Sequence, residues 1–414
     1  MSVISDLGHA GAAARERLFP LAVPLRSAIR QGSLTVIEAD GTAHSFGRPG
    51  TNPQAAIRLH NRRLPFTLLQ NTELRFGEAY MDGTITIEEG TLRDLVEIVA
   101  LNSASGGLVP WQIGAEWFFG LRRRLQQHNP IKRARANVAH HYDLSDQLYE
   151  LFLDPNRQYS CAYFRSTDDT LETAQVNKMR HLADKLMIEP GMRVLDIGSG
   201  WGGLAMYLAR ETGAEVTGLT LSTEQQKYAS LGALKSGLAD RVQFHLRDYR
   251  EETGMYDRIV SVGMLEHVGV NHYPEFFAKV RNLLDIHGIA LLHAIGRRDG
   301  PGATSAWLRK YIFPGGYAPA LSEVLPHIEA SDLWVTDIEV LRLHYARTLH
   351  EWHRRFSANR AQIAELYDER FCRMWELYLV GCEMQFRHLD MMVFQIQLAR
   401  EVDAVPITRD YLYA

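Results

Sequence analysis

Cysteine is scarce in this chain, and its cysteines follow no pattern. Only three occur in 414 residues, Cys161, Cys372 and Cys382, which is too few and too scattered for a disulfide framework. We therefore expect a reducing compartment. The spacings Cys-x-x-Cys and His-Glu-x-x-His are absent as well, so the sequence predicts no metal site.

Long apolar runs and an excess of one charge are also missing. No stretch approaches the roughly 18 apolar residues that a membrane-spanning helix needs, and Arg15, Glu16 and Arg17 interrupt the region where a signal peptide would be apolar. The 45 basic and 49 acidic residues give a net charge of -4, without the basic excess of nucleic-acid binders. We expect a cytoplasmic protein that binds no nucleic acid and meets lipid only at the inner membrane surface.

The chain length predicts two domains, because 414 residues exceed what one hydrophobic core usually organises. Residues 1–105 are predicted to form a small α+β domain. Its expected elements are a β-hairpin, two further strands and a helix: Ser33–Ala39 with Thr42–Phe46, Arg62–Asn71, Thr84–Ile87 and Thr91–Leu101.

Residues 106–135 are predicted to form a linker and a basic helix. Ser103–Gly107 is rich in serine and glycine, and Arg122–Arg124 and Lys132–Arg135 bring basic residues close together. One interpretation is a solvated helix face. The other is a surface for anionic lipid head groups, which attract each nearby basic residue by about 1 kcal/mol. The sequence leaves both open.

Residues 136–414 change to alternating strands and helices, which predicts a doubly wound, largely parallel sheet. The expected strands are Arg193–Gly198, Glu215–Leu221, Val242–Arg247, Tyr256–Val262 and Gly288–Ile295. The expected helices are Trp201–Glu211, Thr223–Ser236 and Pro274–Leu284. After Thr304 we expect mainly helix.

A glycine-rich turn after the first of these strands is the most informative segment. Val194–Gly203 reads Val-Leu-Asp-Ile-Gly-Ser-Gly-Trp-Gly-Gly. Gly198, Gly200 and Gly202 allow the backbone to approach a ligand closely, and their spacing differs from the dinucleotide pattern G-x-G-x-x-G. Because Asp196 before the turn suits a ligand with a cationic amino-acid end, the segment predicts a site for S-adenosylmethionine.

Polar residues at the ends of the next two strands are expected to complete this site. Thr220, Ser222 and Gln225 follow the second strand, where dinucleotide enzymes usually carry an acid. Asp248 and Tyr249 follow the third strand and could bracket an adenine ring. The alternative is that these residues are helix caps or loop residues, as Ser222 in particular could be.

Four further stretches, together with the glycine turn, carry a resemblance to a known family. They are His141–Asp143 with Tyr159–Phe164, Gly263–Gly269, Leu291–Gly296 and Lys310–Gly316. In order and spacing they resemble the cyclopropane-fatty-acyl-phospholipid synthases and the related mycolic acid cyclopropane synthases. The resemblance implies an α/β class I S-adenosylmethionine-dependent methyltransferase fold in residues 136–414, with helical C-terminal additions. It also implies a homodimer and an extra N-terminal domain, for which lipid binding is one interpretation.

The resemblance also implies the residues of two sites. A bicarbonate pocket carries over onto Cys161, Glu266, His293, Tyr345 and the backbone of Ile295. Cofactor contacts carry over onto Tyr159, Ser160, Gly198, Trp201, Thr220, Ser222, Gln225 and Tyr249. The chain departs from many family members at Ser199, where they have cysteine, but both residues are small.

The implied function is transfer of the methyl carbon of S-adenosylmethionine to the cis double bond of an unsaturated phospholipid acyl chain. A cyclopropane ring then closes as bicarbonate removes a proton. Two alternatives stay open. A fatty acyl methyltransferase of the same family would give a methyl-branched or methylated unsaturated chain. An inactive lipid-binding or regulatory protein would keep the fold alone, with residues such as His293 and Cys161 serving only as core.

Overall fold

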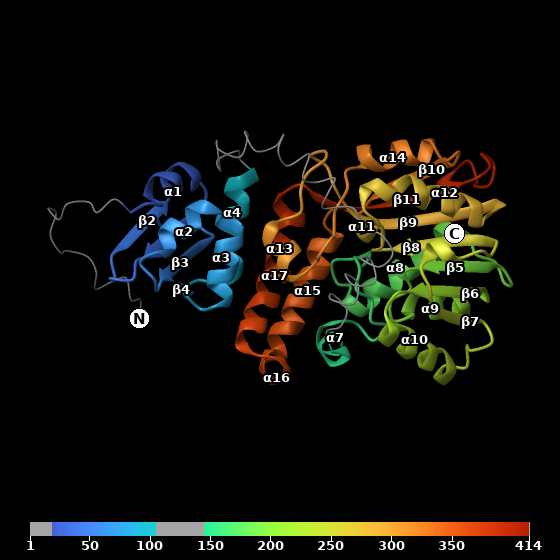
Figure 1. Cartoon of the computed structure of the whole chain (residues 1–414), viewed down its shortest axis with the longest axis horizontal. Helices are drawn as coiled ribbons and strands as arrows, with labels where there is room; N and C mark the ends of the chain where they lie inside the picture. Colours follow the sequence, from blue (N-terminus) through green and yellow to red (C-terminus); the bar gives the residue numbers. More distant parts are fainter. Residues whose placement is uncertain (1–18, 105–144, 414) are drawn as a thin grey trace. The chain divides into compact units, whose positions relative to one another are not determined.

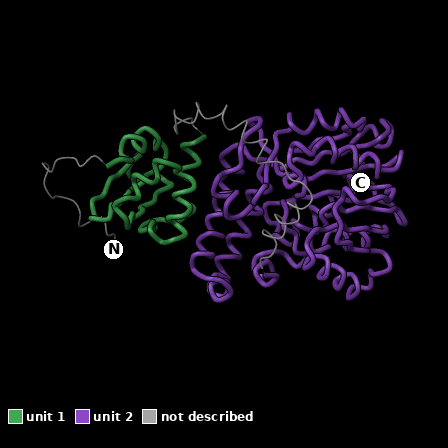
Figure 2. The backbone as a smooth tube through the Cα atoms, in the orientation of Figure 1, with its two compact units in different colours: residues 1–109 green, residues 110–414 purple. Residues whose placement is uncertain are grey.

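The computed structural model describes residues 19–104 and 145–413. The chain divides into two compact units, residues 1–109 and 110–414 (Figure 2), and each is described by itself. The predicted linker and basic helix at 106–135 and the His141–Asp143 stretch lie outside the described residues.

The N-terminal unit is a four-stranded sheet with helices packed against it (Figure 1). The strand order is β2-β1-β3-β4, with the strands β1 (Ser33–Ile37), β2 (Ala43–Gly47), β3 (Gln54–Leu59) and β4 (Ile85–Glu89). The helices are α1 (Ala22–Ala28), α2 (Leu64–Gln70), α3 (Thr72–Met81) and α4 (Leu92–Ala104). The hairpin of β1 and β2 is confirmed, and so is α4, whose first turn is capped by the hydroxyl of Thr91.

One prediction in this unit is wrong, and one strand was not predicted. Arg62–Asn71 was expected as a strand but contains helix α2, where Pro65 occupies the first turn and Leu64 and Leu68 are buried four residues apart. Proline fits the first turn of a helix because that turn has no partner for its N–H groups. The strand that pairs with β1 is instead β3, whose small residues Ala55 and Ala56 gave little strand signal.

The second unit is built on a seven-stranded sheet of order β10-β11-β9-β8-β5-β6-β7 (Figure 1). Its strands are β5 (Arg193–Ile197), β6 (Glu215–Thr220), β7 (Val242–Leu246), β8 (Tyr256–Val262), β9 (Leu284–Arg297), β10 (Trp334–Val340) and β11 (Met391–Ala399). Its helices include α7 (Asp146–Phe152), α8 (Leu171–Leu186), α9 (Gly203–Thr212), α10 (Thr223–Lys235), α11 (Leu265–Val268), α12 (Tyr273–Leu283), α13 (Ala306–Tyr311) and α14 (Leu321–Glu329). Three more helices of the described residues follow: α15 (His344–Ala358), α16 (Arg360–Leu366) and α17 (Glu369–His388).

Helices cover both faces of this sheet, as the alternating pattern predicts. Val194 of β5 joins a core with α8, α9 and α10, whereas Leu195 and Ile197 join a second core with α12 and α14. Successive residues of a strand point to opposite faces, so β5 is buried on both sides. The pairs from β7 to β9 are parallel, and β11 runs antiparallel to β9 and β10.

The expectation of mainly helix after Thr304 misses β10 and β11. Strand β11 is buried along nearly its whole length, but Gln395 and Gln397 interrupt its apolar run. Their amides bond to groups far away in sequence, His293 and the Lys185 carbonyl. Because those partners come from the tertiary structure, the sequence pattern of this strand is ambiguous.

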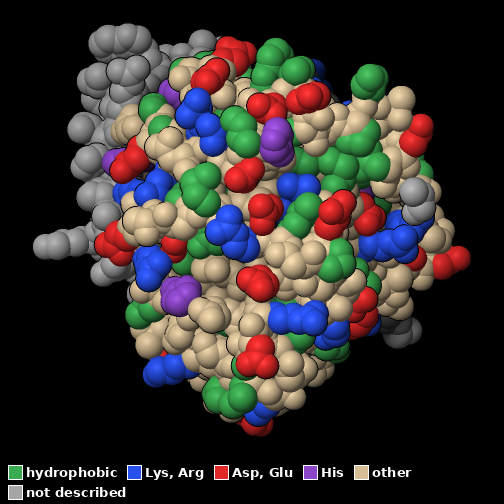
Figure 3. Space-filling view, turned by 90° about the vertical axis from the view of Figure 1, so that its right-hand side faces the viewer, with side chains coloured by type: hydrophobic (Ala, Val, Ile, Leu, Met, Phe, Trp, Pro, Cys, Tyr) green, Lys and Arg blue, Asp and Glu red, His purple; other side chains and the backbone are tan. Residues whose placement is uncertain are grey.

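The surface agrees with the balanced composition. On the face of the molecule shown in Figure 3, acidic and basic side chains are interspersed. Among residues 19–104 and 145–413, no helix has the length and apolar character needed to cross a bilayer.

Candidate active site

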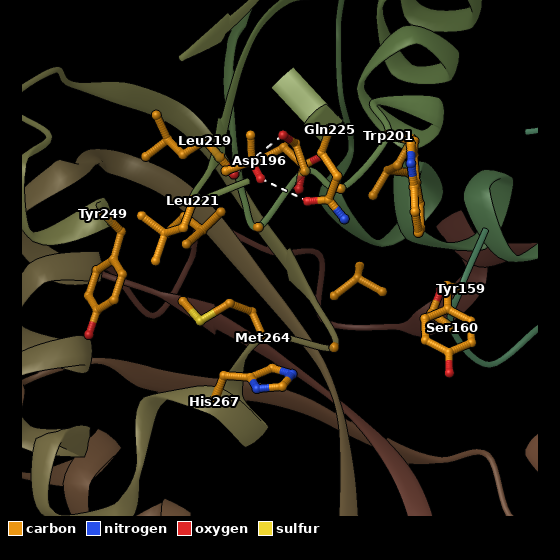
Figure 4. A pocket seen from close by; sticks show the side chains of 18 of the residues that line it. Tyr159, Ser160, Asp196, Trp201, Leu219, Leu221, Gln225, Tyr249, Met264 and His267 are labelled. Carbon is orange, nitrogen blue, oxygen red and sulfur yellow. Dashed lines mark hydrogen bonds between the residues drawn. The ribbon is translucent and has the colours of Figure 1, made fainter. Parts of the chain in front are cut away.

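A pocket opens where β5, β6 and β8 end, the edge at which ligands bind in open α/β sheets. Figure 4 shows its side chains surrounding an open space. Asp196 and Gln225 lie on one side, Met264 and His267 on the opposite side, and Trp201, Tyr159 and Ser160 close a third. We call this the glycine-loop pocket.

The glycine turn forms the floor of the pocket through its backbone. Gly198 and Gly200 have φ of +88° and +54°, a region that favours glycine. The N–H groups of Gly198 and Ser199 both donate to the Leu219 carbonyl, at 3.0 and 2.8 Å. This ties the turn to the end of β6. The predicted residues Gly198 and Gly200 therefore line the pocket.

Two predicted contacts lie behind the pocket wall instead. Gly202 is the N-cap of α9, and a Cβ there would lie 2.5 Å from the ring of Phe244. Ser222 caps α10 by accepting the Gln225 N–H at 3.3 Å. Neither residue lines the pocket. Both residues shape the pocket through local backbone structure. For Ser222 this is the helix-cap role that was expected as the alternative to cofactor contact.

Asp196 is the most strongly perturbed acid of the pocket. Its side chain is buried, and its Oδ2 has no hydrogen-bond partner in the described part of the chain. Burial raises the pKa of this carboxyl to about 7, and the nearby charge of Lys178 opposes the rise. A buried carboxylate oxygen without a partner is costly. It therefore fits a ligand that presents an ammonium group or another donor.

The other predicted polar residues have defined partners. Thr220 donates its hydroxyl to Gln225 Oε1 at 2.9 Å. Asp248 binds the Arg250 guanidinium through both oxygens, at 2.8 and 2.7 Å, so its carboxylate is neutralised. Tyr249 is largely buried, with its ring edge-on to Phe276 at 5.3 Å. All four predicted residues line the pocket.

The segment between α7 and α8 supplies another wall. The Tyr159 hydroxyl lies 2.8 Å from that of Tyr378, and its ring stacks on Trp352 at 5.0 Å. Ser160 Oγ accepts a hydrogen bond from Lys178 Nζ at 2.9 Å. Trp201 donates its indole N–H to Asp146 at 3.2 Å. These contacts hold the predicted residues Tyr159, Ser160 and Trp201 in place.

Several residues that line the pocket were not identified from the sequence. They are Arg157, Gln158, Arg247, Arg250, Met264 and His267. Met264 and His267 lie in the Gly263–Gly269 stretch of the resemblance, so a signal for them existed. Burial lowers the pKa of His267 to about 4, which makes it a neutral wall residue. Arg157 and Gln158 carried no sequence signal.

Of the residues predicted to bind bicarbonate, Glu266 follows β8 on α11 and is bonded to Ile295. We call Cys161, Glu266, His293, Ile295 and Tyr345 the Glu266 cluster. The Ile295 N–H donates to Glu266 Oε1 at 2.6 Å, whereas Glu266 Oε2 is buried and has no partner among residues 19–104 and 145–413. Burial raises the pKa of Glu266 to about 7, and the Ile295 hydrogen bond opposes this.

His293 lies at the carboxyl end of β9, in register with Val262 of β8 and Gln395 of β11. Its Nδ1 is 3.2 Å from Gln395 Nε2. Burial, followed by the charges of Lys178 and Lys185, lowers the pKa of His293 to about 3. The ring is therefore neutral. When the Gln395 amide donates to Nδ1, the remaining proton lies on Nε2.

Helix α15 lies near both Cys161 and Tyr345. Cys161 is buried, and burial raises the pKa of its thiol well above the usual range, so it is not a thiolate nucleophile. The N–H of the following residue, Ala162, donates to Thr348 Oγ1 of α15 at 3.0 Å. Tyr345 lies one turn earlier on α15, edge-on to Phe386 at 4.8 Å. The direct contact within the predicted set is the hydrogen bond between Ile295 and Glu266.

In the described ranges, no group of three or more His, Cys, Asp or Glu side chains is arranged to hold a metal ion.

Comparison with known proteins places this geometry in a family. The model of the mycolic acid cyclopropane synthetase family matches residues 129–396, and a domain of unknown function matches residues 26–106. The cyclopropane-fatty-acyl-phospholipid synthase of Escherichia coli K12 is 38% identical over 355 residues, covering 84% of this chain and 89% of that protein. A "Probable fatty acid methyltransferase" of Pseudomonas putida is 37% identical, with 81% and 85% covered.

Solved structures agree with the sequence comparison. Mycolic acid cyclopropane synthase CmaA1, in complex with SAH and CTAB, superposes with a TM-score of 0.61 at 35% identity, covering 64% of this chain and 97% of that one. The family model spans more than half of the chain. The chain therefore belongs to the mycolic acid cyclopropane synthetase family and has the class I fold of S-adenosylmethionine-dependent methyltransferases.

Proposed function

We propose that this protein transfers the methyl carbon of S-adenosylmethionine to the cis double bond of an unsaturated phospholipid acyl chain and closes a cyclopropane ring. The observation that carries the proposal is the buried Glu266 carboxyl, whose Oε2 has no partner in the described ranges. It lies between Met264 and His267, which both line the glycine-loop pocket. A proton acceptor or carrier is therefore built beside the methyl-donor site.

The residues of the glycine-loop pocket fit S-adenosylmethionine. The orphaned Oδ2 of Asp196 suits the ammonium group of its amino-acid end. Thr220 and Gln225 offer neutral polar groups of the kind that bind hydroxyls. When bound, the sulfonium supplies an electrophilic methyl group. The protein's part is to hold the acyl double bond in line with that methyl group and to exclude water.

The Glu266 cluster fits an anion such as bicarbonate in part. His293, with its proton on Nε2, can donate, and Glu266 can donate or accept because its pKa lies near 7. Ile295 departs from the role implied by the resemblance, since its N–H is already bonded to Glu266. We assign Ile295 the role of orienting Glu266. When bound, bicarbonate would supply the base that takes the proton lost on ring closure.

The proton balance follows from the reaction. Methyl transfer to the alkene leaves a positive charge on the acyl chain, and loss of one hydrogen from the transferred carbon closes the ring. Phe313, whose ring lies 6.5 Å from that of His267, is the aromatic residue we assign to stabilise that charge. Glu266 and His293 would hold the acceptor that takes the hydrogen lost from the transferred carbon.

The test is expression in a host that makes no cyclopropane fatty acids, followed by analysis of the lipids. We expect a mass increase of one CH₂ on unsaturated acyl chains and upfield cyclopropane signals in the proton NMR spectrum. Unmodified lipids, with active expression shown by S-adenosylhomocysteine binding, would contradict the proposal. The bicarbonate assignment has its own test: removing carbonate from degassed enzyme should slow the reaction, and full activity would exclude that base.

A second candidate is a fatty acyl methyltransferase that leaves a methyl branch or a methylated alkene. The observation that favours this candidate is the identity of this chain to the probable fatty acid methyltransferase of Pseudomonas putida, which is about as high as its identity to the synthase from Escherichia coli. A ring and a methylated alkene have equal mass, so NMR alone separates them. The third possibility, an inactive lipid-binding or regulatory protein, predicts no binding of S-adenosylhomocysteine in calorimetry.

We also infer that the enzyme works at the inner membrane surface as a homodimer, since its proposed substrate is part of a bilayer. Co-sedimentation with vesicles of phosphatidylglycerol and phosphatidylethanolamine should show adsorption that weakens with salt. Light scattering should give twice the mass of one chain. A monomer that ignores such vesicles would overturn this part of the proposal without touching the chemistry.

A further inference from the structure

Helix α8 contains three buried polar side chains that the proposed reaction does not use, and two of them, Gln175 and Lys178, lie close together. Both are 0% exposed. They are three residues apart, so they lie on the same face of the helix. An ammonium group is rarely buried without a specific set of partners. What these two side chains contact therefore indicates their purpose.

Both side chains contact the same short segment, residues 158–160. The Gln175 amide donates to the carbonyl oxygens of Gln158 and Ser160, at 3.2 and 3.0 Å. Lys178 Nζ donates to Gln158 Oε1 and to Ser160 Oγ, at 2.5 and 2.9 Å. Four hydrogen bonds from one face of α8 thus fix the backbone and both polar side chains of this segment.

The segment held in this way is a wall of the glycine-loop pocket. Gln158, Tyr159 and Ser160 all line it, and the segment has no strand or helix of its own to keep it in position. Its position therefore depends on side-chain hydrogen bonds. A shift of the segment would move Tyr159 and Ser160 together.

The charge of Lys178 also acts on the pocket. Its ammonium group is within electrostatic reach of Asp154, Cys161 and Asp196, and it opposes the effect of burial on Asp196. Lys178 in this way keeps the Asp196 carboxyl closer to its ionised form, which is the form that attracts a cationic ligand.

We propose that Gln175 and Lys178 are positioning residues for the methyl donor: from α8 they hold residues 158–160 as a wall of the glycine-loop pocket. The proposal rests on the proposed function in taking S-adenosylmethionine as the ligand. It assigns neither residue a contact with the reacting atoms.

Lys185 provides a matched control for Lys178. It lies on the same helix, is 1% exposed, and makes a charged hydrogen bond with Glu339 at 2.6 Å. Glu339 is on β10 and is not part of the pocket wall. Lys178→Met and Lys185→Met thus remove the same group from equally buried positions. Only the first removes a contact to residues 158–160.

The experiment measures the dissociation constant of S-adenosylhomocysteine by calorimetry for the full-length wild type and both variants, with thermal unfolding of each. We expect Lys178→Met to weaken binding by about tenfold or more, since it leaves two polar groups unpaired in the wall. Lys185→Met should stay within about twofold of the wild type. In turnover, the KM for S-adenosylmethionine should rise in Lys178→Met while the KM for lipid does not.

Equal affinities in Lys178→Met and Lys185→Met would overturn the inference while leaving the proposed function intact. A wild type that binds no S-adenosylhomocysteine would contradict both. If Lys178→Met does not fold, Gln175→Leu tests the same wall by removing the hydrogen bonds to two carbonyl groups. It should weaken binding several-fold, and unchanged binding in a folded Gln175→Leu protein would reject the proposal.

Discussion

The glycine-loop pocket and the Glu266 cluster lie at the same edge of one sheet, but they treat charge in different ways. In the pocket, Asp248 is paired with Arg250, and the charge of Lys178 opposes the effect of burial on Asp196, whose pKa still rises to about 7. In the cluster, burial drives the titratable groups toward their neutral forms, raising the pKa of Glu266 and lowering that of His293. A site that binds a cationic ligand needs fixed charge, whereas a site that handles a proton needs groups that can change charge.

Glu266→Gln should distinguish the Glu266 cluster from the glycine-loop pocket most clearly. The amide keeps the size of the side chain and can still accept from Ile295, but it cannot exchange a proton. We expect ring formation to fall by about 100-fold or more, with the dissociation constant of S-adenosylhomocysteine within about twofold of the wild type. Turnover assays with lipid vesicles and calorimetry measure the two quantities. Wild-type turnover would show that the cluster has no part in the chemistry.

The same variant tests the charge state of the cluster through stability. The folded-state pKa of Glu266 is raised from 4.5 to about 7. The contribution of this group to the free energy of unfolding is therefore fully present below about pH 4.5 and is lost as the pH rises through 7. The free energy of unfolding of Glu266→Gln, measured relative to that of the wild type, should therefore rise by about 1.4 kcal/mol per pH unit between pH 5 and 7. Denaturant unfolding at several pH values measures this. Parallel curves would mean that Glu266 titrates normally.

A pair of glycine variants tests the structure of the glycine-loop pocket. In Gly203→Ala, the new Cβ would lie 2.2 Å from the Asn156 carbonyl oxygen and 2.6 Å from Gln158 Nε2, so it pushes on the wall segment and should cost about 1 to 3 kcal/mol. Gly200→Ala meets no atom within 4 Å and faces only the strain of φ +54°, about 1 to 2 kcal/mol. Denaturant unfolding should show a larger loss of stability in Gly203→Ala than in Gly200→Ala. The reverse order would contradict the geometry of the wall.

The smallest expected effect concerns the tautomer of His293. Gln395→Leu removes the donor to His293 Nδ1 and should lower kcat by about tenfold, the equivalent of one hydrogen bond, without changing the KM for S-adenosylmethionine. Gln397→Leu is the control, because Gln397 is equally buried on β11 but bonds to Thr336 and the Lys185 carbonyl. Equal loss of kcat in both variants would reduce the role of Gln395 to packing.

Prediction from the sequence succeeded where the signal is local. The turn between β5 and α9 was found because glycine spacing and apolar alternation both lie within ten residues of Val194–Gly203. The strand β11 was missed because its glutamines bond to partners that are distant in the sequence, such as His293, Lys185 and Thr336. Gly202 and Ser222, predicted as cofactor contacts, are the N-cap residues of α9 and α10 and are not among the residues that line the pocket.

The sequence by itself determined the alternation of strands and helices, the glycine turn and the set of residues that the family resemblance carries. Only the tertiary structure decided which polar side chains are buried. Lys178 looks like any surface lysine in the pattern of α8, and Ile295 looks like an ordinary strand residue. The physical reason is that burial and hydrogen-bond partners depend on segments distant in the chain. The charge state of Asp196, Glu266 and His293 therefore appears only once those segments have packed.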